Sequence, residues 1–65
     1  MQIRINGEER EVAAATLEEL LAELGYGDQL VGTALNLDFV RAKDRADARL
    51  KQGDAVEILA PKQGG

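Results

Sequence analysis

The residues with the clearest potential for chemistry are the last two, Gly64 and Gly65, which follow Pro61-Lys62-Gln63. Glycine has no Cβ, so a segment ending in glycines can enter a narrow channel and approach a nucleotide closely. A carboxylate is a poor acyl donor until it is activated, normally as an acyl adenylate made from ATP. A sulfur donor can then attack the carbonyl and leave a thiocarboxylate. The end of the chain is therefore predicted to be a substrate of other enzymes.

The Gly-Gly pair is a weak signal when taken alone. With glycine usage near 7%, two terminal glycines occur by chance in about one chain in two hundred, and a linker remnant or a frayed end is the alternative interpretation. The context of the pair strengthens this signal, because Pro61 cannot donate to a sheet ladder and so ends the strand that precedes the tail. We expect one folded domain over residues 1–61 and a flexible tail over residues 62–65.

The side chains offer little catalytic chemistry. The 65 residues include no Cys, His or Ser, which excludes the nucleophilic triads and the usual zinc sites. Glu8, Glu9 and Glu11 could bind a hard cation, but carboxylates at a hairpin edge more often protect that edge. We predict that the protein is not an enzyme and binds no metal or cofactor, and that ATP is used by an activating partner.

Charge and hydropathy narrow the possible partners. The net charge of −4 argues against nucleic acid. Five basic residues fall within one short segment, but Asp44 and Asp47 lie among them, which favours a solvated mixed-charge segment; they are Arg41, Lys43, Arg45, Arg49 and Lys51. No apolar run approaches the roughly 20 residues that span a bilayer, and no signal peptide is visible. A cytoplasmic, reducing location and no membrane partner are expected.

The first half of the chain predicts a hairpin and a helix. Ile3 and Ile5 alternate with polar residues as in a half-buried strand, Asn6-Gly7 favours a type I′ turn, and residues 8–12 return. Residues 16–19 form a capping box, in which the Thr16 hydroxyl accepts from the Glu19 N–H and the Glu19 carboxylate accepts from the Thr16 N–H. The leucines that follow lie on one helix face and Gly25 ends the helix; they are Leu17, Leu20, Leu21 and Leu24.

The second half predicts mainly strands. Val31, Thr33 and Leu35 alternate with smaller or polar residues, and Leu37-Asp38 is predicted to form a turn. We expect a short extended return at 39–40, a helical or irregular charged segment at 41–50 and a last strand at 55–59. One helix covers one face of a sheet, so the predicted class is α+β, a mixed sheet of four to five strands over one main helix.

The uncovered face of that sheet is the candidate docking surface. If Thr33 and Leu35 face the helix, then Ala34 and Leu59 face the other side, beside the small Gly32. An exposed apolar strip rimmed by charge is how a small module docks to a partner. The alternative is that Leu59 is a scattered surface leucine. The pattern does not decide whether Phe39 belongs to the core or to this strip.

Over its full length the sequence resembles the ThiS-type sulfur carriers of thiamine biosynthesis, which are ubiquitin-like β-grasp proteins. An ordered set of short pieces carries the resemblance: Met1-Gln2-Ile3, Thr16-Leu17, Leu20-Leu21, Ala34-Leu35-Asn36, Val40, Leu50, Gly53-Asp54, Val56-Glu57-Ile58 and Gln63-Gly64-Gly65. The resemblance implies that the first and last strands are central parallel neighbours. The MoaD-type subunits of molybdopterin synthase share the fold and the Gly-Gly end but usually run longer.

The resemblance also implies a mechanism. A ThiF-like adenylating enzyme would join AMP to the Gly65 carboxylate, with Gly64 giving access, and a sulfurtransferase or cysteine desulfurase relay would produce the thiocarboxylate. A ThiG-like thiazole synthase would then receive the sulfur. A MoaD-type carrier and a ubiquitin-like modifier of lysines remain open as alternatives. Residues 43–49 depart from the relatives, which often place a large apolar residue there, commonly Trp.

Overall fold

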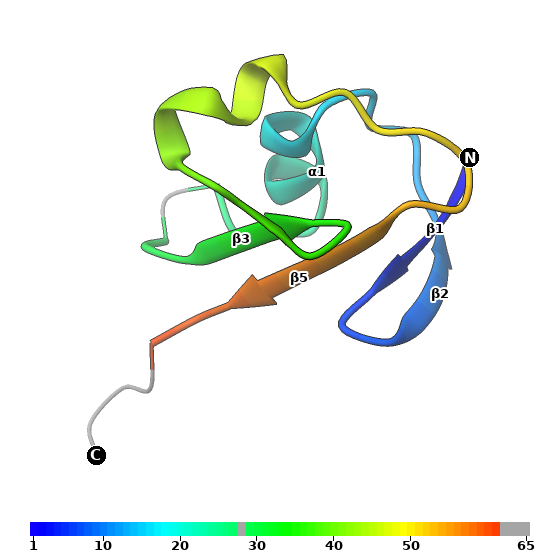
Figure 1. Ribbon diagram of the computed structural model, residues 1–65, viewed down its shortest axis with the longest axis horizontal. Helices are drawn as coiled ribbons and strands as arrows, with labels where there is room; N and C mark the ends of the chain where they lie inside the picture. The colour runs from blue at the N-terminus through cyan, green and yellow to red at the C-terminus, as the bar shows by residue number, and fades with distance from the viewer. Residues whose placement is uncertain (28, 62–65) are drawn as a thin grey trace.

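A mixed β-sheet packs one face against a short α-helix (Figure 1). The structure, a computed structural model, describes residues 1–27 and 29–61. Its elements, in chain order, are β1 (Gln2–Ile5), β2 (Glu8–Glu11), α1 (Leu17–Glu23), β3 (Gly32–Leu35), β4 (Asp38–Val40), the 3-10 helix η1 (Ala42–Asp47) and β5 (Ala55–Leu59). The predicted α+β class is confirmed, with a sheet of five strands.

The sheet has the strand order β2-β1-β5-β3-β4, so β5 lies at its centre. β1 runs parallel to β5, and its last residue, Ile5, lies opposite Val56. β3 runs antiparallel to β5, from Gly32 opposite Leu59 to Leu35 opposite Val56. The first and last strands are therefore parallel neighbours inside the sheet, as the resemblance implied.

Both hairpins turn through residues with positive φ. Asn6 has φ 50° and Gly7 has φ 88°, which confirms the type I′ turn between β1 and β2. The second turn was predicted at Leu37-Asp38, and that prediction was wrong by one residue. Asn36 has φ 51° and Leu37 has φ 74°, so these two residues make the turn and Asp38 already pairs in β4.

The helix begins at the predicted cap. The Thr16 hydroxyl accepts from the Glu19 N–H at 3.2 Å, which supplies one of the first-turn donors with a partner. The Glu19 carboxylate, however, accepts from the N–H of Ala15 at 2.8 Å, where Thr16 was predicted. The position of Ala15 is fixed by its carbonyl, which accepts from the Leu50 N–H at 2.9 Å. This contact places the Ala15 N–H over the first turn of the helix.

The helix ends in a Schellman motif at Gly25. The Tyr26 N–H donates to the Leu21 carbonyl at 2.7 Å, and the Gly25 N–H donates to the Ala22 carbonyl at 3.2 Å. Gly25 has φ 89°, a left-handed conformation that costs glycine little. The predicted end of the helix is confirmed.

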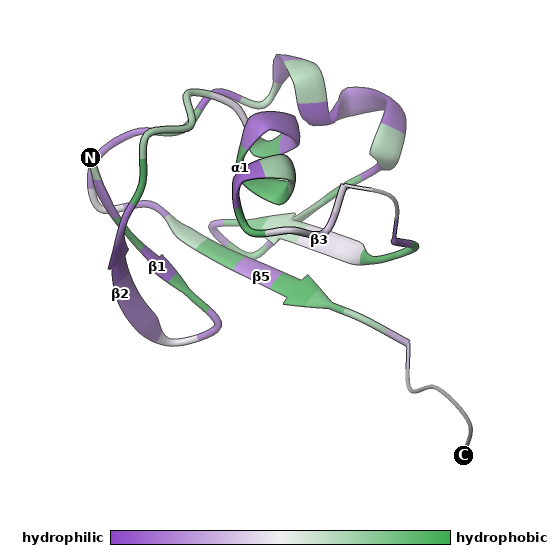
Figure 2. Cartoon of the chain, turned by 180° about the vertical axis from the view of Figure 1, so that it is seen from behind, coloured by the Kyte–Doolittle hydropathy of each residue, from purple (hydrophilic) through white to green (hydrophobic). Residues whose placement is uncertain are grey.

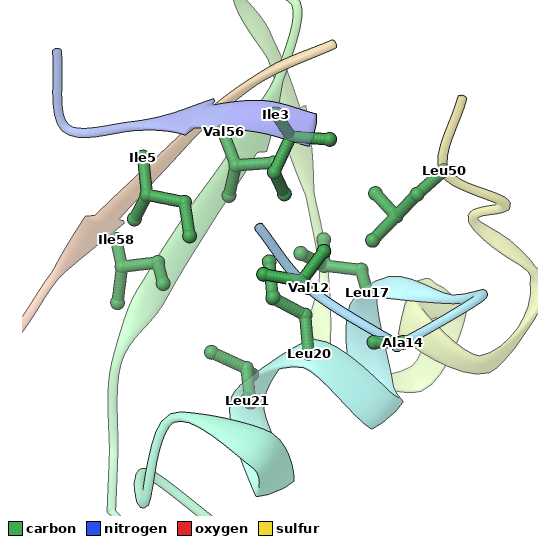
Figure 3. Close-up of a cluster of buried hydrophobic side chains, with 10 residues drawn as sticks. All are labelled: Ile3, Ile5, Val12, Ala14, Leu17, Leu20, Leu21, Leu50, Val56 and Ile58. Atoms are coloured by element: carbon green, nitrogen blue, oxygen red, sulfur yellow. The ribbon is translucent and has the colours of Figure 1, made fainter. Parts of the chain in front are cut away.

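The core lies between α1 and the covered face of the sheet (Figure 3). Leu17 and Leu20 of the helix are 0% exposed, and Ile3 and Val56 of the two parallel strands are 1% exposed. Figure 3 shows the helix leucines pointing toward the side chains of β1 and β5. The ten buried hydrophobic residues are Ile3, Ile5, Val12, Ala14, Leu17, Leu20, Leu21, Leu50, Val56 and Ile58. The central strand β5 is thus held firmly on its inner face.

Candidate functional site

The strand β5 is the last element before the predicted reactive end of the chain. Gly64 and Gly65 lie outside the described residues, as does the rest of the predicted tail, 62–65. β5 ends at Leu59, and Figure 1 shows the chain leaving the sheet beyond the end of β5. The alternation of β5 places Val56 and Ile58 in the core, so the strand that carries the end of the chain is anchored by two buried side chains.

The start of β5 is fixed by a buried carboxylate. Asp54 is 6% exposed; its Oδ2 accepts from the Lys51 N–H at 2.8 Å and its Oδ1 accepts from the Asn36 side-chain amide at 3.1 Å. The backbone before it turns through Gly53, which has φ 88°. Gly53-Asp54 is one of the pieces that carried the resemblance, and its structural role is to set where β5 begins.

The predicted docking residues lie together on the uncovered face of the sheet. Gly32 lies opposite Leu59, and Ala34 lies opposite Glu57 on one side and Phe39 on the other. We call Gly32, Ala34, Phe39, Glu57 and Leu59 the outer-face patch. Phe39 is 71% exposed and Leu59 is 73% exposed, so Phe39 belongs to the surface and not to the core, a question that the sequence left open.

The outer-face patch is hollowed at its centre. Its residues, with Thr33, line a shallow cavity of about 80 Å³. The hollow arises because β3 contributes the small residues Gly32 and Ala34, whereas the flanking strands contribute Leu59 and Phe39. Figure 2 shows β5 as mostly apolar, with one hydrophilic band in the middle of the strand. The one charged residue of this strand is Glu57. A cavity of this size, with mainly apolar walls and one carboxylate at its rim, accommodates a single apolar side chain.

The charged segment holds one residue whose role was not predicted. Arg45 was expected to lie in a solvated segment, yet it is half-buried, and its guanidinium donates to the Thr33 hydroxyl at 3.0 Å and to the Val31 carbonyl at 2.6 Å. The Thr33 hydroxyl in turn donates to the Val40 carbonyl at 2.7 Å. Arg45 therefore joins η1 to β3. The other four basic residues of the segment are exposed as expected: Arg41, Lys43, Arg49 and Lys51.

The described residues offer neither a metal-binding cluster nor a membrane-spanning helix. Across 1–27 and 29–61, no three or more acidic side chains gather so that they could hold a metal ion. In the same part of the chain, no helix has the length and apolar character needed to cross a membrane.

Comparison with known sequences identifies close relatives. The model of the ThiS family matches residues 3–65. The sulfur carrier protein ThiS of Thermus thermophilus is 38% identical over 61 residues, which cover 94% of this chain and 95% of the relative. A thiazole synthase of Paramagnetospirillum magneticum is 41% identical over 66 residues, which cover all of this chain. The chain spans only 20% of the length of that thiazole synthase.

Solved structures show the same fold. The crystal structure of the thiamine biosynthesis protein ThiS from Geobacter metallireducens matches with a TM-score of 0.80 at 32% identity, and both chains are covered completely. An NMR solution structure of a thiamine biosynthesis protein from that organism matches with a TM-score of 0.83 at 30% identity. This match covers all of the present chain and 88% of the other. The predicted β-grasp fold is therefore confirmed.

Proposed function

This chain belongs to the ThiS family, and we propose that it is a sulfur carrier for thiazole formation in thiamine biosynthesis. The observation that carries the proposal is the Gly64-Gly65 end, which follows shortly after the central strand β5. The fold supplies an anchored strand, and the glycines supply a narrow segment that an enzyme channel can accept.

The reactive atom is the carbonyl carbon of Gly65. One of its carboxylate oxygens attacks the α-phosphorus of ATP within a ThiF-like adenylating enzyme, and pyrophosphate leaves. The outer sulfur of a persulfide, carried by a sulfurtransferase or cysteine desulfurase relay, then attacks the carbonyl carbon. AMP departs with the bonding electrons, and an acyl disulfide joins Gly65 to the relay. A thiol then attacks the relay's sulfur, which forms a disulfide with the relay and releases the thiocarboxylate on Gly65. The carrier holds no cofactor in this scheme, because ATP binds to the activating enzyme.

The acceptor of the sulfur is proposed to be a ThiG-like thiazole synthase. In the Paramagnetospirillum relative, a stretch similar to this entire chain forms a fifth of a polypeptide named thiazole synthase. Joining the carrier to its acceptor in one polypeptide keeps the two at a high effective concentration. This observation favours thiazole formation over molybdopterin synthesis as the destination of the sulfur.

The outer-face patch is proposed to dock to the partner enzymes. Leu59, the last residue of β5, forms one wall of the cavity, so a partner that covers the patch lies beside the point where the chain leaves the sheet. Glu57 at the rim favours a partner surface with a complementary cation. Docking of this kind brings the end of the chain to the enzyme without requiring any catalytic group on the carrier.

The proposal is tested by the intact mass of the chain after incubation with ATP, a ThiF-like enzyme and a sulfur source. We expect an AMP adduct that is replaced by a product in which one oxygen has become sulfur. A variant lacking Gly64 and Gly65 should remain unmodified, whereas the matched control Lys62→Ala with Gln63→Ala should react. An unmodified wild-type chain would exclude sulfur carriage, and higher-mass conjugates at lysines in a lysate would favour a protein modifier.

A further inference from the structure

The outer-face patch lies largely on the β3–β4 hairpin, which the hydrophobic core holds only in part. Gly32 and Ala34 of the patch are in β3, and Phe39 is in β4. The buried hydrophobic cluster takes no residue from either strand. Within these two strands, which the structure describes completely, Thr33 alone is buried, at 2% exposed. The hairpin is therefore anchored mainly at a polar side chain.

Hydrogen bonds around Thr33 hold the hairpin together. The Thr33 hydroxyl donates to the Val40 carbonyl at 2.7 Å and so links β3 to β4, the strand at the edge of the sheet. The Nε of Arg45 donates to the same hydroxyl at 3.0 Å, and its Nη2 donates to the Val31 carbonyl at 2.6 Å. Because Val31 and Thr33 flank Gly32, the guanidinium grips the chain on both sides of a patch residue.

Arg45 reaches these groups from the covered side of the sheet. η1 packs against α1, and Figure 1 shows the two side by side. Side chains alternate along a strand, so Thr33 faces this layer while Gly32 and Ala34 face the patch. The guanidinium offers several donors in one rigid plane, which lets a single side chain serve two acceptors. Arg45 does not line the cavity of the patch, so it can affect a bound partner only through the hairpin.

From these contacts we infer that Arg45 is a positioning residue for the outer-face patch, an inference that rests on the proposed docking function. Together with the Thr33 hydroxyl, Arg45 holds β3 on the helical layer and β4 on β3. Phe39, one wall of the cavity, is 71% exposed, so its own side chain does little to fix β4. A hairpin that leaves this arrangement for part of the time binds more weakly in proportion.

The variant Arg45→Met tests the inference, because it removes the donors and keeps a long, adaptable side chain. Lys43→Met is the matched control, since Lys43 is exposed in the same η1 and the change removes the same charge. Thr33→Val removes the hydroxyl and keeps a β-branched side chain, and it tests the same network should Arg45→Met not fold. Binding to a ThiF-like enzyme and to a thiazole synthase is measured by calorimetry at a temperature where circular dichroism shows the variants folded.

For Arg45→Met we expect faster amide hydrogen exchange in β4, with exchange in β5 close to that of the wild type. Kd should rise about three- to thirtyfold for both enzymes. Lys43→Met should leave Kd within about twofold of the wild type. A role confined to stability would lower the thermal midpoint and leave the Kd of the folded chain unchanged.

A double-mutant cycle with Phe39→Ala shows whether Arg45 acts through the patch. Once that wall is removed, adding Arg45→Met should raise Kd by less than about twofold. Wild-type affinity in Arg45→Met and Thr33→Val, an equal rise in Lys43→Met, or additive losses in the cycle would overturn the positioning role alone, while Leu59→Ala still weakens binding. A wild-type chain that binds neither enzyme would overturn the docking proposal and this inference with it.

Discussion

Replacing Leu59 by alanine separates docking from folding at the outer-face patch. Leu59 ends β5 and is 73% exposed, so its side chain contributes little to the core of the free protein. Surface substitutions of this kind change the free energy of unfolding by less than about 0.5 kcal/mol. The fold and the thermal midpoint should therefore be unchanged. Any loss of activity then reports a loss of partner binding.

The size of that loss follows from the area that Leu59 still exposes. Complete burial of a leucine side chain contributes about 1.5–3 kcal/mol. A partner that covers the exposed 73% therefore gains about 1–2 kcal/mol from this side chain. Since about 1.4 kcal/mol corresponds to a factor of ten, Kd should rise about five- to thirtyfold.

The assay is calorimetric titration of the variant with the ThiF-like enzyme and with the thiazole synthase. Leu30→Ala is the matched control, because Leu30 is 86% exposed and does not line the cavity of the patch. Its Kd should stay within about twofold of the wild type. Equal affinities of Leu59→Ala and the wild type for both partners would refute the docking proposal, as would an equal effect of Leu30→Ala.

Three further substitutions test how the fold is held. Leu20→Ala removes a side chain that is 0% exposed and should cost about 2–5 kcal/mol in urea unfolding; a smaller loss would contradict a tightly packed core. Leu37→Gly relieves a leucine at φ 74° and should stabilise by about 0.5–1 kcal/mol, whereas no gain would argue against that strain. The Glu23 carboxylate accepts from the N–H groups of Ala13 and Ala14. Glu23→Ala should cost about 1–2 kcal/mol and speed exchange of both amides, and unchanged exchange would refute the contact.

Local patterns predicted the parts of the fold that local physics determines. Asn6-Gly7 specified its turn because the pair tolerates two positive φ angles. The Thr16 cap and the end of the helix at Gly25 followed because each depends on contacts within one turn of the chain. The outer-face patch followed in outline because side chains alternate along a strand.

Features that depend on distant contacts or on uncommon conformations could not be predicted from the sequence. Leu37 at φ 74° carries no turn signal, since leucine rarely adopts a left-handed conformation. In the sequence Arg45 looks like one solvated charge among several, because its contacts with Thr33 and Val31 exist only once η1 and β3 are brought together in the fold. The hydrogen bond from the Asn6 side chain to the Ile58 carbonyl joins residues 52 positions apart, so it requires the completed sheet.

Sulfur carriage is tested by following an isotopic sulfur label from Gly65 to a product. The chain is converted to its labelled thiocarboxylate, purified, and given to the ThiG-like thiazole synthase with its other substrates. We predict that the label appears in the thiazole and that the carrier returns to its original mass with a carboxylate at Gly65. Unlabelled thiazole, or a label that stays on the carrier while thiazole forms, would contradict this prediction.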